Sequence, residues 1–179
     1  MRISPRLLSS LLLLALSSGA VPASAGDCRS LLRPLLLATE PAPEALERVR
    51  SVCQAEADAG DAEATYELSF FSLGLGGQWQ PEQAIALIRS AADRGVTEAQ
   101  YWLAWQSEAG PELPHDPAIA LGWYQKAAAG RHRLALQRLA DASEKGELGL
   151  PVDPRKALEY RAQIRRCEED NARASQSSF

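Results

Sequence analysis

The stretch Ala99-Gln100-Tyr101-Trp102-Leu103 has a counterpart on each side of it in the chain. Ala64-Thr65-Tyr66-Glu67-Leu68 lies 35 residues before it, and Ala135-Leu136-Gln137-Arg138-Leu139 lies 36 residues after it. Self-similarity at a fixed period of about 20 to 50 residues is typical of repeat proteins, in which each unit is one supersecondary motif. The sequence therefore predicts three successive copies of one structural unit.

The second half of each unit opens with a helix-start signal. Gln80-Pro81, Asp116-Pro117 and Asp153-Pro154 are spaced by 36 and 37 residues, and each precedes a periodic apolar run. Because aspartate caps a helix and proline fits its first position, each unit contains a second helix. The first helix of each unit is expected to end near a glycine that can take the left-handed conformation. These glycines are Gly74, Gly110 and Gly146.

A further helical hairpin is predicted before the three units. Residues 28–38 and 43–58 form its two helices, joined by a proline-rich turn. Cys28 and Cys53 are equally distant from this turn, so we expect their sulfur atoms to lie level and to form a disulfide worth about 3 kcal/mol. Cys167 lies six helices further on. It is expected to stay a buried thiol or to bond another molecule.

Together these features predict an all-α fold, a short α/α superhelical solenoid of helical hairpins with about eight helices. No alternating stretch indicates a strand. One hairpin alone buries too little apolar surface, so each unit depends on its neighbours and the first hairpin serves as a cap. The expected divisions are the capping hairpin at 26–59, units at about 60–95, 96–131 and 132–167, and a disordered tail at 168–179.

Over about residues 60–167 the units resemble the Sel-one-like repeats, which are relatives of the tetratricopeptide repeats. The shared elements are Ala99-x-Tyr101-x-Leu103, the Asp-Pro helix starts, and Trp-Tyr-Gln-Lys-Ala-Ala at 123–128. The resemblance implies an α-solenoid that binds other proteins. The chain departs from the family where an aromatic residue is usual, and has serine there instead: Ser72, Ser107 and Ser143.

Residues 1–25 have the organisation of a secretory signal peptide. A basic start is followed by an apolar run from Leu7 to Leu16 and by the small residues Ala23-Ser24-Ala25. The apolar run is roughly half as long as a membrane span requires. We therefore expect cleavage after Ala25 and a periplasmic or secreted protein, in a compartment where a disulfide persists.

The charge of the chain narrows the classes of partner. The 179 residues carry a formal net charge of −4. Residues 27–116 contain 15 acidic and 6 basic residues, whereas residues 117–179 contain 8 and 11. An acidic chain lacks the positive surface that would bind nucleic acids or anionic membranes. The uneven distribution favours an oriented protein partner or head-to-tail self-association, with incidental surface bias as the alternative.

Side chains that could catalyse a reaction are nearly absent. His115 and His132 are the only histidines, and both fall at predicted turns without an acidic residue at a metal-binding interval. Residues 74–77, Gly-Leu-Gly-Gly, follow a helix and so indicate a turn, not a phosphate-binding loop. No serine lies in a nucleophile elbow. We therefore expect no enzymatic activity, no metal and no cofactor.

Aromatic residues recur on the first helices of two units, where Tyr66 and Phe70, and Tyr101 and Trp105, are each four residues apart. If these helices line the concave side, as the resemblance implies, the rings form either a binding stripe or packing between helices. Trp102 is expected to be the most exposed ring. Exposed tyrosine and tryptophan are typical of binding hot spots. The predicted protein-binding residues are Tyr66, Phe70, Tyr101, Trp102, Trp105, Gln137 and Asp141.

The resemblance and these residues predict an exported, non-catalytic scaffold or adaptor that binds a protein of the envelope. The family also implies an alternative, an immunity protein that neutralises a secreted type VI effector of the lipase type. An immunity protein would bind one toxin tightly, whereas an adaptor would bind several partners more weakly. An envelope hydrolase is a third class, disfavoured by the missing nucleophile and base.

Overall fold

The computed structural model describes residues 27–176, which form eight helices. The predicted signal peptide therefore lies outside the described residues. Within them, β-type pairing is limited to one bridge between Leu73 and Trp79, and the predicted all-α solenoid is confirmed. The helices are α1 (Cys28–Leu37), α2 (Pro43–Asp58), α3 (Ala62–Ser72), α4 (Pro81–Asp93), α5 (Thr97–Ala109), α6 (Pro117–Ala129), α7 (Arg133–Lys145) and α8 (Pro154–Gln176).

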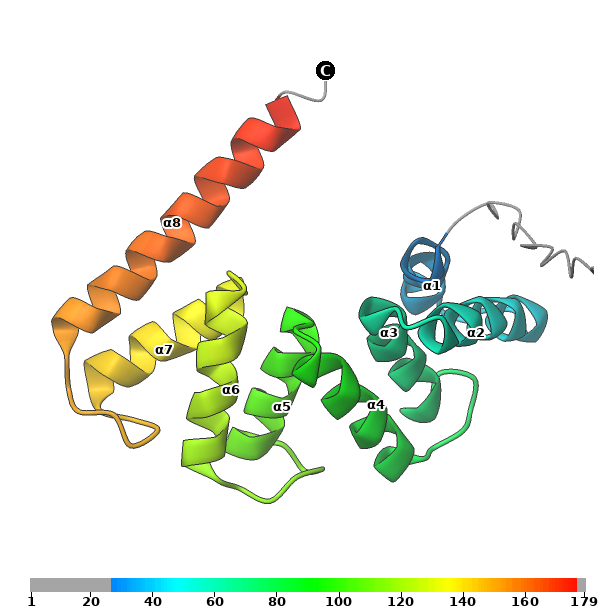
Figure 1. Ribbon diagram of the computed structural model, residues 1–179, viewed down its shortest axis with the longest axis horizontal. Helices are drawn as coiled ribbons and strands as arrows, with labels where there is room; N and C mark the ends of the chain where they lie inside the picture. The colour runs from blue at the N-terminus through cyan, green and yellow to red at the C-terminus, as the bar shows by residue number, and fades with distance from the viewer. Residues whose placement is uncertain (1–26, 177–179) are drawn as a thin grey trace, which may run out of the picture.

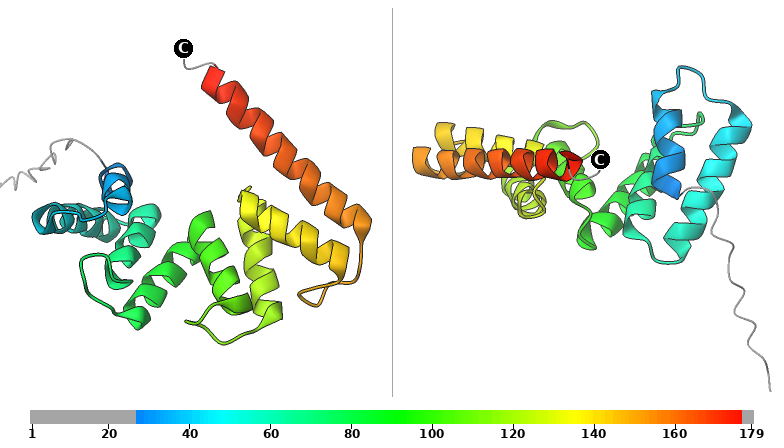
Figure 2. Two further views of the ribbon diagram at one scale, coloured as in Figure 1. Left: turned by 180° about the vertical axis from the view of Figure 1, so that it is seen from behind. Right: turned by 90° about the horizontal axis from the view of Figure 1, so that it is seen from above.

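The helices stack in chain order into a curved solenoid (Figure 1). Each helix packs mainly against its neighbours in sequence, and α1 also packs against α3. Helices α1 and α8 stand at the two ends of the arc, facing each other across its open side (Figure 1). Seen from above, α7 and α8 run side by side at one end, and α1 and α2 lie at the other (Figure 2).

Alanines at equivalent positions let the helices approach closely. On the first helices, Ala64, Ala99 and Ala135 are at most 2% exposed. Their counterparts on the second helices are equally buried. Because alanine adds little bulk and loses no side-chain entropy on burial, the larger leucine and isoleucine side chains can fill the space between helices. The counterparts are Ala84, Ala120 and Ala157.

The three serines that depart from the family pattern share one backbone contact. The carbonyl groups of Ser72, Ser107 and Ser143 each accept a hydrogen bond from the backbone N–H that immediately precedes the next helix-opening proline, at 2.8, 2.8 and 2.7 Å. This contact joins the end of each first helix to the start of the second. The predicted caps are confirmed, since the Asp116 and Asp153 carboxylates each accept two N–H groups of their helices.

One of the three predicted glycine turns differs from expectation. Gly74 and Gly146 have φ angles of 106° and 73°, in the left-handed region, but Gly110 has a φ of −78°. The reason is the Gln106 side chain, which folds back over the end of α5 and accepts the N–H of Glu112 at 3.0 Å. A Cβ atom on Gly110 would lie 1.9 Å from Gln106 Oε1, so this position needs glycine for space.

The predicted capping hairpin is held by the disulfide between Cys28 and Cys53, whose Cα atoms are 4.7 Å apart. Both cysteines are fully buried, and they pack with Leu32 and Leu68 in a cluster that joins the hairpin to the first repeat. The N–H of Cys28 also donates to Glu56 at 3.1 Å. The hairpin is therefore linked covalently within itself and by apolar packing to α3.

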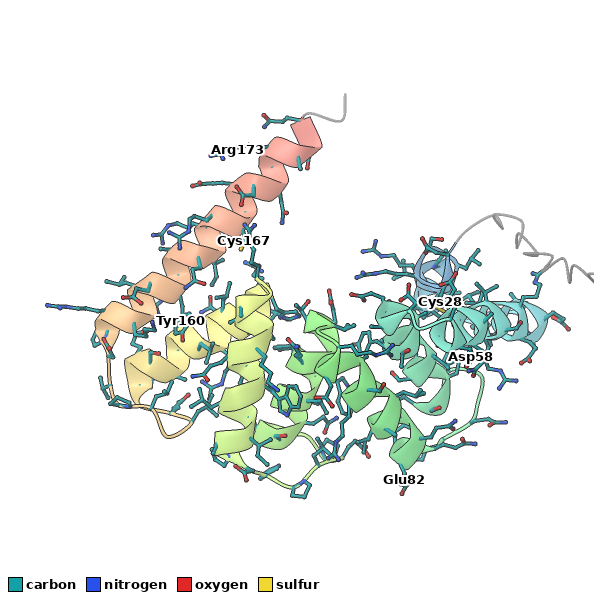
Figure 3. The ribbon with its side chains drawn as sticks, viewed as in Figure 1. Cys28, Asp58, Glu82, Tyr160, Cys167 and Arg173 are labelled. Atoms are coloured by element: carbon teal, nitrogen blue, oxygen red, sulfur yellow. A yellow bond between two sulfur atoms is a disulfide. The ribbon has the colours of Figure 1, made fainter. Side chains whose placement is uncertain are left out.

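The predicted disordered tail is wrong for residues 168–176, because α8 continues to Gln176. Ion pairs from the start of α7 support this extension: Arg131 contacts Asp170, and Arg133 contacts Glu168 at 3.1 Å. Cys167 is a free, half-buried thiol beside the Arg131 guanidinium. Figure 3 shows Cys167 midway along α8 and Arg173 beyond it. No helix within residues 27–176 combines the length and apolarity that crossing a bilayer requires.

Candidate protein-binding surface

The predicted aromatic stripe is divided among three packing environments. Tyr66 and Phe70 make an edge-to-face contact with ring centroids 5.3 Å apart. Tyr66 packs against the apolar cluster of α4 and α5, Phe70 against the cluster around the disulfide, and Tyr101 against the cluster of α6 and α7. Among the described residues, no ring contact joins the aromatics of α3 to those of α5. These three half-buried rings fill space between helices.

Tyr101 also fixes the position of a histidine. Its ring stacks on His132 with centroids 4.4 Å apart, and it lies 5.9 Å from the ring of Tyr124. His132 Nδ1 accepts the N–H of Ala135 at 3.3 Å and so caps α7. Burial lowers the pKa of His132, although the Glu98 charge opposes this shift. The imidazole is therefore neutral, as an acceptor nitrogen requires, and its role is structural.

Trp102 is not the most exposed ring, contrary to the prediction. It is half-buried and packs against the cluster that contains Ile88 and Leu103. Trp105, one turn further along α5, is 44% exposed. The apolar residues of α5 alone do not predict this burial, because α4 supplies a second apolar surface that covers Trp102. Trp105 is thus the exposed indole of this helix.

The predicted polar continuation on α7 is engaged within the chain. Gln137 donates to Asp141 at 3.0 Å, and Asp141 lies 3.7 Å from the Arg161 guanidinium on α8. Arg161 also pairs with Glu144. Gln137 is exposed, but Asp141 belongs to the contact between α7 and α8.

Sequence reasoning missed a second exposed tryptophan. Trp79 lies in the loop between α3 and α4 and is 61% exposed, more than Trp105. Gln78 and Gln80 on either side of it line a groove of about 480 Å³, whose apolar floor includes Leu46 and Phe71. The loop was predicted only as a turn. The sequence signal for an exposed ring was a tryptophan in a turn, with two glycines before it and a proline after it.

Sequence reasoning also missed an acidic cluster at the start of α3 and α5. The guanidinium of Arg29, on α1, lies 3.7 Å from Glu63, 3.7 Å from Glu67 and 3.6 Å from Glu98. The spacing of 35 residues between Glu63 and Glu98 matches the repeat and could have shown that they lie side by side. The position of Arg29 depends on the packing of α1 against α3, which the sequence alone did not predict.

The protonation behaviour of the cluster follows from this crowding. Burial raises the pKa of Glu67 despite the Arg29 charge, and burial together with the Glu98 charge raises the pKa of Glu63. Burial and the same carboxylates raise the pKa of Tyr66 to about 12. For Glu98 burial is outweighed by hydrogen bonds, including one from Thr97, and its pKa is lowered. The Arg29 charge therefore does not offset the burial of Glu63 and Glu67.

Glu108 on α5 shows how this chain satisfies a comparable carboxylate. It accepts hydrogen bonds from Tyr124 at 2.8 Å and from the Arg138 guanidinium, which also donates to Glu147 at 2.7 Å. Burial disfavours the charge of Glu108, but these donors outweigh it and lower its pKa. These contacts connect α5, α6 and α7. Its role is to join the second and third units.

The pattern of the Sel1 repeat matches residues 62–96, 97–132 and 133–160, more than half of the chain. The chain belongs to the Sel1 repeat family. The first two matched units begin and end within two residues of the predicted ones, and the third is shorter at its end. Sel1 repeats mediate protein–protein interactions.

Two solved structures of Sel1 repeat proteins share the fold. A Sel1 repeat protein from Oxalobacter formigenes superimposes with a TM-score of 0.64 at 22% identity, covering 77% of this chain and 56% of that one. The protective antigen c5321 of uropathogenic Escherichia coli, which displays the same fold, gives a TM-score of 0.59 at 29% identity, covering 65% of this chain and 25% of that one. This Sel1 protein thus spans about half of the first and a quarter of the second.

Proposed function

We propose that this Sel1 repeat protein is an exported, non-catalytic scaffold that binds a protein partner through the surface around Trp105. The exposed indole carries the proposal. Trp105 is 44% exposed, so its apolar ring is partly uncovered on a helix that otherwise packs against its neighbours. Tryptophan is among the residues that contribute most to the binding energy of protein interfaces. Tyr66, Phe70, Tyr101 and Trp102 pack between helices, so Trp105 is the ring of the predicted set that is left to bind a partner.

Export is supported by two independent features. The first 25 residues have the organisation of a signal peptide, and the disulfide between Cys28 and Cys53 belongs to an oxidising compartment. We propose cleavage after Ala25 and a mature periplasmic protein. Intact-mass measurement on the protein from a periplasmic fraction tests this directly. A mass that includes Met1, or a lipid on Cys28, would contradict it.

Two tryptophans of α5 provide a matched test of the binding surface. Trp105→Ala is expected to weaken partner binding by about 2 kcal/mol, a typical hot-spot loss, with little change in Tm. Trp102→Ala, which truncates a ring packed against the core, is expected to cost about 3 kcal/mol of stability. The partner is first captured from periplasmic extract and identified, and its affinity for each variant is then measured. Unchanged affinity for Trp105→Ala would refute the proposed surface.

The number and affinity of captured partners separate the adaptor from the alternative role in immunity. An adaptor is expected to retain several envelope proteins with modest affinity. An immunity protein is expected to retain a single secreted effector, of the lipase type by family analogy, and to abolish its activity in a stoichiometric mixture. The unequal charge of the two halves of the chain is compatible with either partner.

A further inference from the structure

The carboxylates around Arg29 have too few hydrogen-bond donors. All three distances from its guanidinium nitrogens, 3.6 to 3.7 Å, exceed those of a hydrogen bond. The Glu67 side chain is only 10% exposed, and its ion pair with the Arg29 guanidinium, at 3.7 Å, is longer than a hydrogen bond. Glu63 Oε2 is buried and has no hydrogen-bond partner in the described structure. A buried carboxylate without donors is costly, so this arrangement is incomplete.

The charges facing the cluster leave it negative. Asp61 adds a fourth acidic group near Glu63. Arg33 is a second, more distant cation, and it acts on Glu67 alone. His132, near Glu98, is neutral for the reason given above. Four acidic side chains, those of the three glutamates and Asp61, therefore face two arginines beside the ring of Tyr66.

Glu108 is a carboxylate of the same chain that has close hydrogen-bond donors. Glu108 receives hydrogen bonds from Tyr124 and Arg138 at 2.8 Å, and its pKa is lowered. Glu67 is more buried than Glu108 but has no such donor. Glu108 thus has close donors, whereas Glu63 and Glu67 are paired with Arg29 only at 3.7 Å, beyond hydrogen-bond distance.

We infer that Glu63, Glu67 and Glu98 receive an arginine or lysine side chain from the protein partner. The inference rests on the proposed scaffold function and identifies the chemistry of the segment that docks. Arginine carries five N–H donors and a full charge, and lysine three donors, which supply what Glu63 and Glu67 lack. No group of side chains among the described residues is arranged to hold a metal ion, so a basic side chain fits better than a divalent cation.

A pair of peptides tests this inference without the natural partner. The probes are N-acetyl-Leu-Arg-Leu-amide and its citrulline analogue, which has the same shape without the charge. Titration is followed by NMR through the side-chain carboxyl carbons of the intact mature protein. We expect the arginine peptide to bind about tenfold more tightly than the citrulline peptide, as one close charge pair provides, and to shift the Glu63 and Glu67 signals.

Three variants make the test specific. Glu67→Gln and Glu98→Gln should each reduce the preference for arginine to about twofold or less; Glu98 is 40% exposed, so its replacement spares the core. Glu82→Gln is the control, because Glu82 lies at the start of α4, far from Cys28 on α1 (Figure 3), and should keep the full preference. Equal binding of the two peptides, or a preference that survives both substitutions, overturns the inference.

Two further outcomes are decisive. Shifts of the Glu63 and Glu67 signals by calcium ions but not by the arginine peptide would overturn the inference in favour of a cation site. The proposed binding surface fails separately, through unchanged partner affinity of Trp105→Ala. Arginine preference in a protein whose Trp105→Ala variant binds its partner normally would support the basic-residue site and refute only the proposed surface.

Discussion

The two ends of the solenoid are stabilised in different ways. At the N-terminal end, α1 is 10 residues long and contains Pro34, and a disulfide joins it to α2. At the C-terminal end, α8 is 23 residues long and is held by packing on α7 and by ion pairs. A short helix buries too little apolar area to remain docked alone. A covalent bond therefore substitutes for helix length at the end where the terminal helix is short.

Removing the disulfide should have the largest effect. Cys28→Ala with Cys53→Ala is expected to lower the free energy of unfolding by about 3 kcal/mol, because the 25-residue separation no longer restricts the unfolded chain. Hydrogen exchange should show that α1 and α2 lose protection first. Cys167→Ala is the control and should leave exchange unchanged. Retained protection in α1 would mean that apolar packing alone holds this end.

The second prediction concerns the apolar attachment of α8. Ile164 is 8% exposed and packs in the cluster of α6 and α7. Ile164→Ala is expected to cost about 2 kcal/mol or more, from lost burial and the cavity that remains. Leu158, on the same helix, is 61% exposed, and Leu158→Ala should cost little. Equal melting temperatures for the two variants would contradict a packing-based attachment.

Ion pairs should contribute less than packing at the same end. A double-mutant cycle on Arg131 and Asp170 is expected to shift Tm by at most a few degrees, because both side chains are about half exposed. Exchange protection beyond residue 167 should fall in either single variant. The coupling should vanish in 1 M salt, where charges are screened over about 3 Å. Coupling that persists there would indicate a non-electrostatic contact.

The smallest expected effect is a pH dependence at the start of α7. Because burial lowers the pKa of His132 below its ordinary 6.5, the unfolded chain binds a proton more readily. Stability should therefore fall as pH decreases through about 6.5. His132→Asn keeps a capping acceptor but does not titrate. The difference in Tm between the two proteins should change over pH 5 to 7; a constant difference would refute this role.

Local and repeated signals made most of the fold predictable. The spacing of Ala64, Ala99 and Ala135 predicted the units, and the aspartate-proline pairs predicted where the second helices begin. Cys28 and Cys53 could be paired because both flank one turn. Each of these inferences depended on residues within one hairpin or at equivalent positions of adjacent hairpins, where sequence distance and spatial distance agree.

The predictions were wrong or incomplete where segments far apart in the sequence contact each other. Arg131 contacts Asp170 across 39 residues, so the continuation of α8 could not be read from the polar composition of its end. The burial of Trp102 depends on α4, and the acidic cluster depends on where α1 places Arg29. Such contacts depend on the angle between packed helices, which repeat spacing alone does not determine.

The serine carbonyl contacts have a consequence for altering the protein. Each one closes a loop by joining its two ends, so the loops can differ in length while the start of the second helix stays beside the end of the first. The loops already differ, spanning 73–80, 110–116 and 146–153. Doubling a closed loop costs only about 0.6 kcal/mol in chain entropy. An epitope or a fluorescent reporter inserted in one of these loops must therefore leave the residues that pack on the core in place, namely Leu73, Leu113 and Leu148.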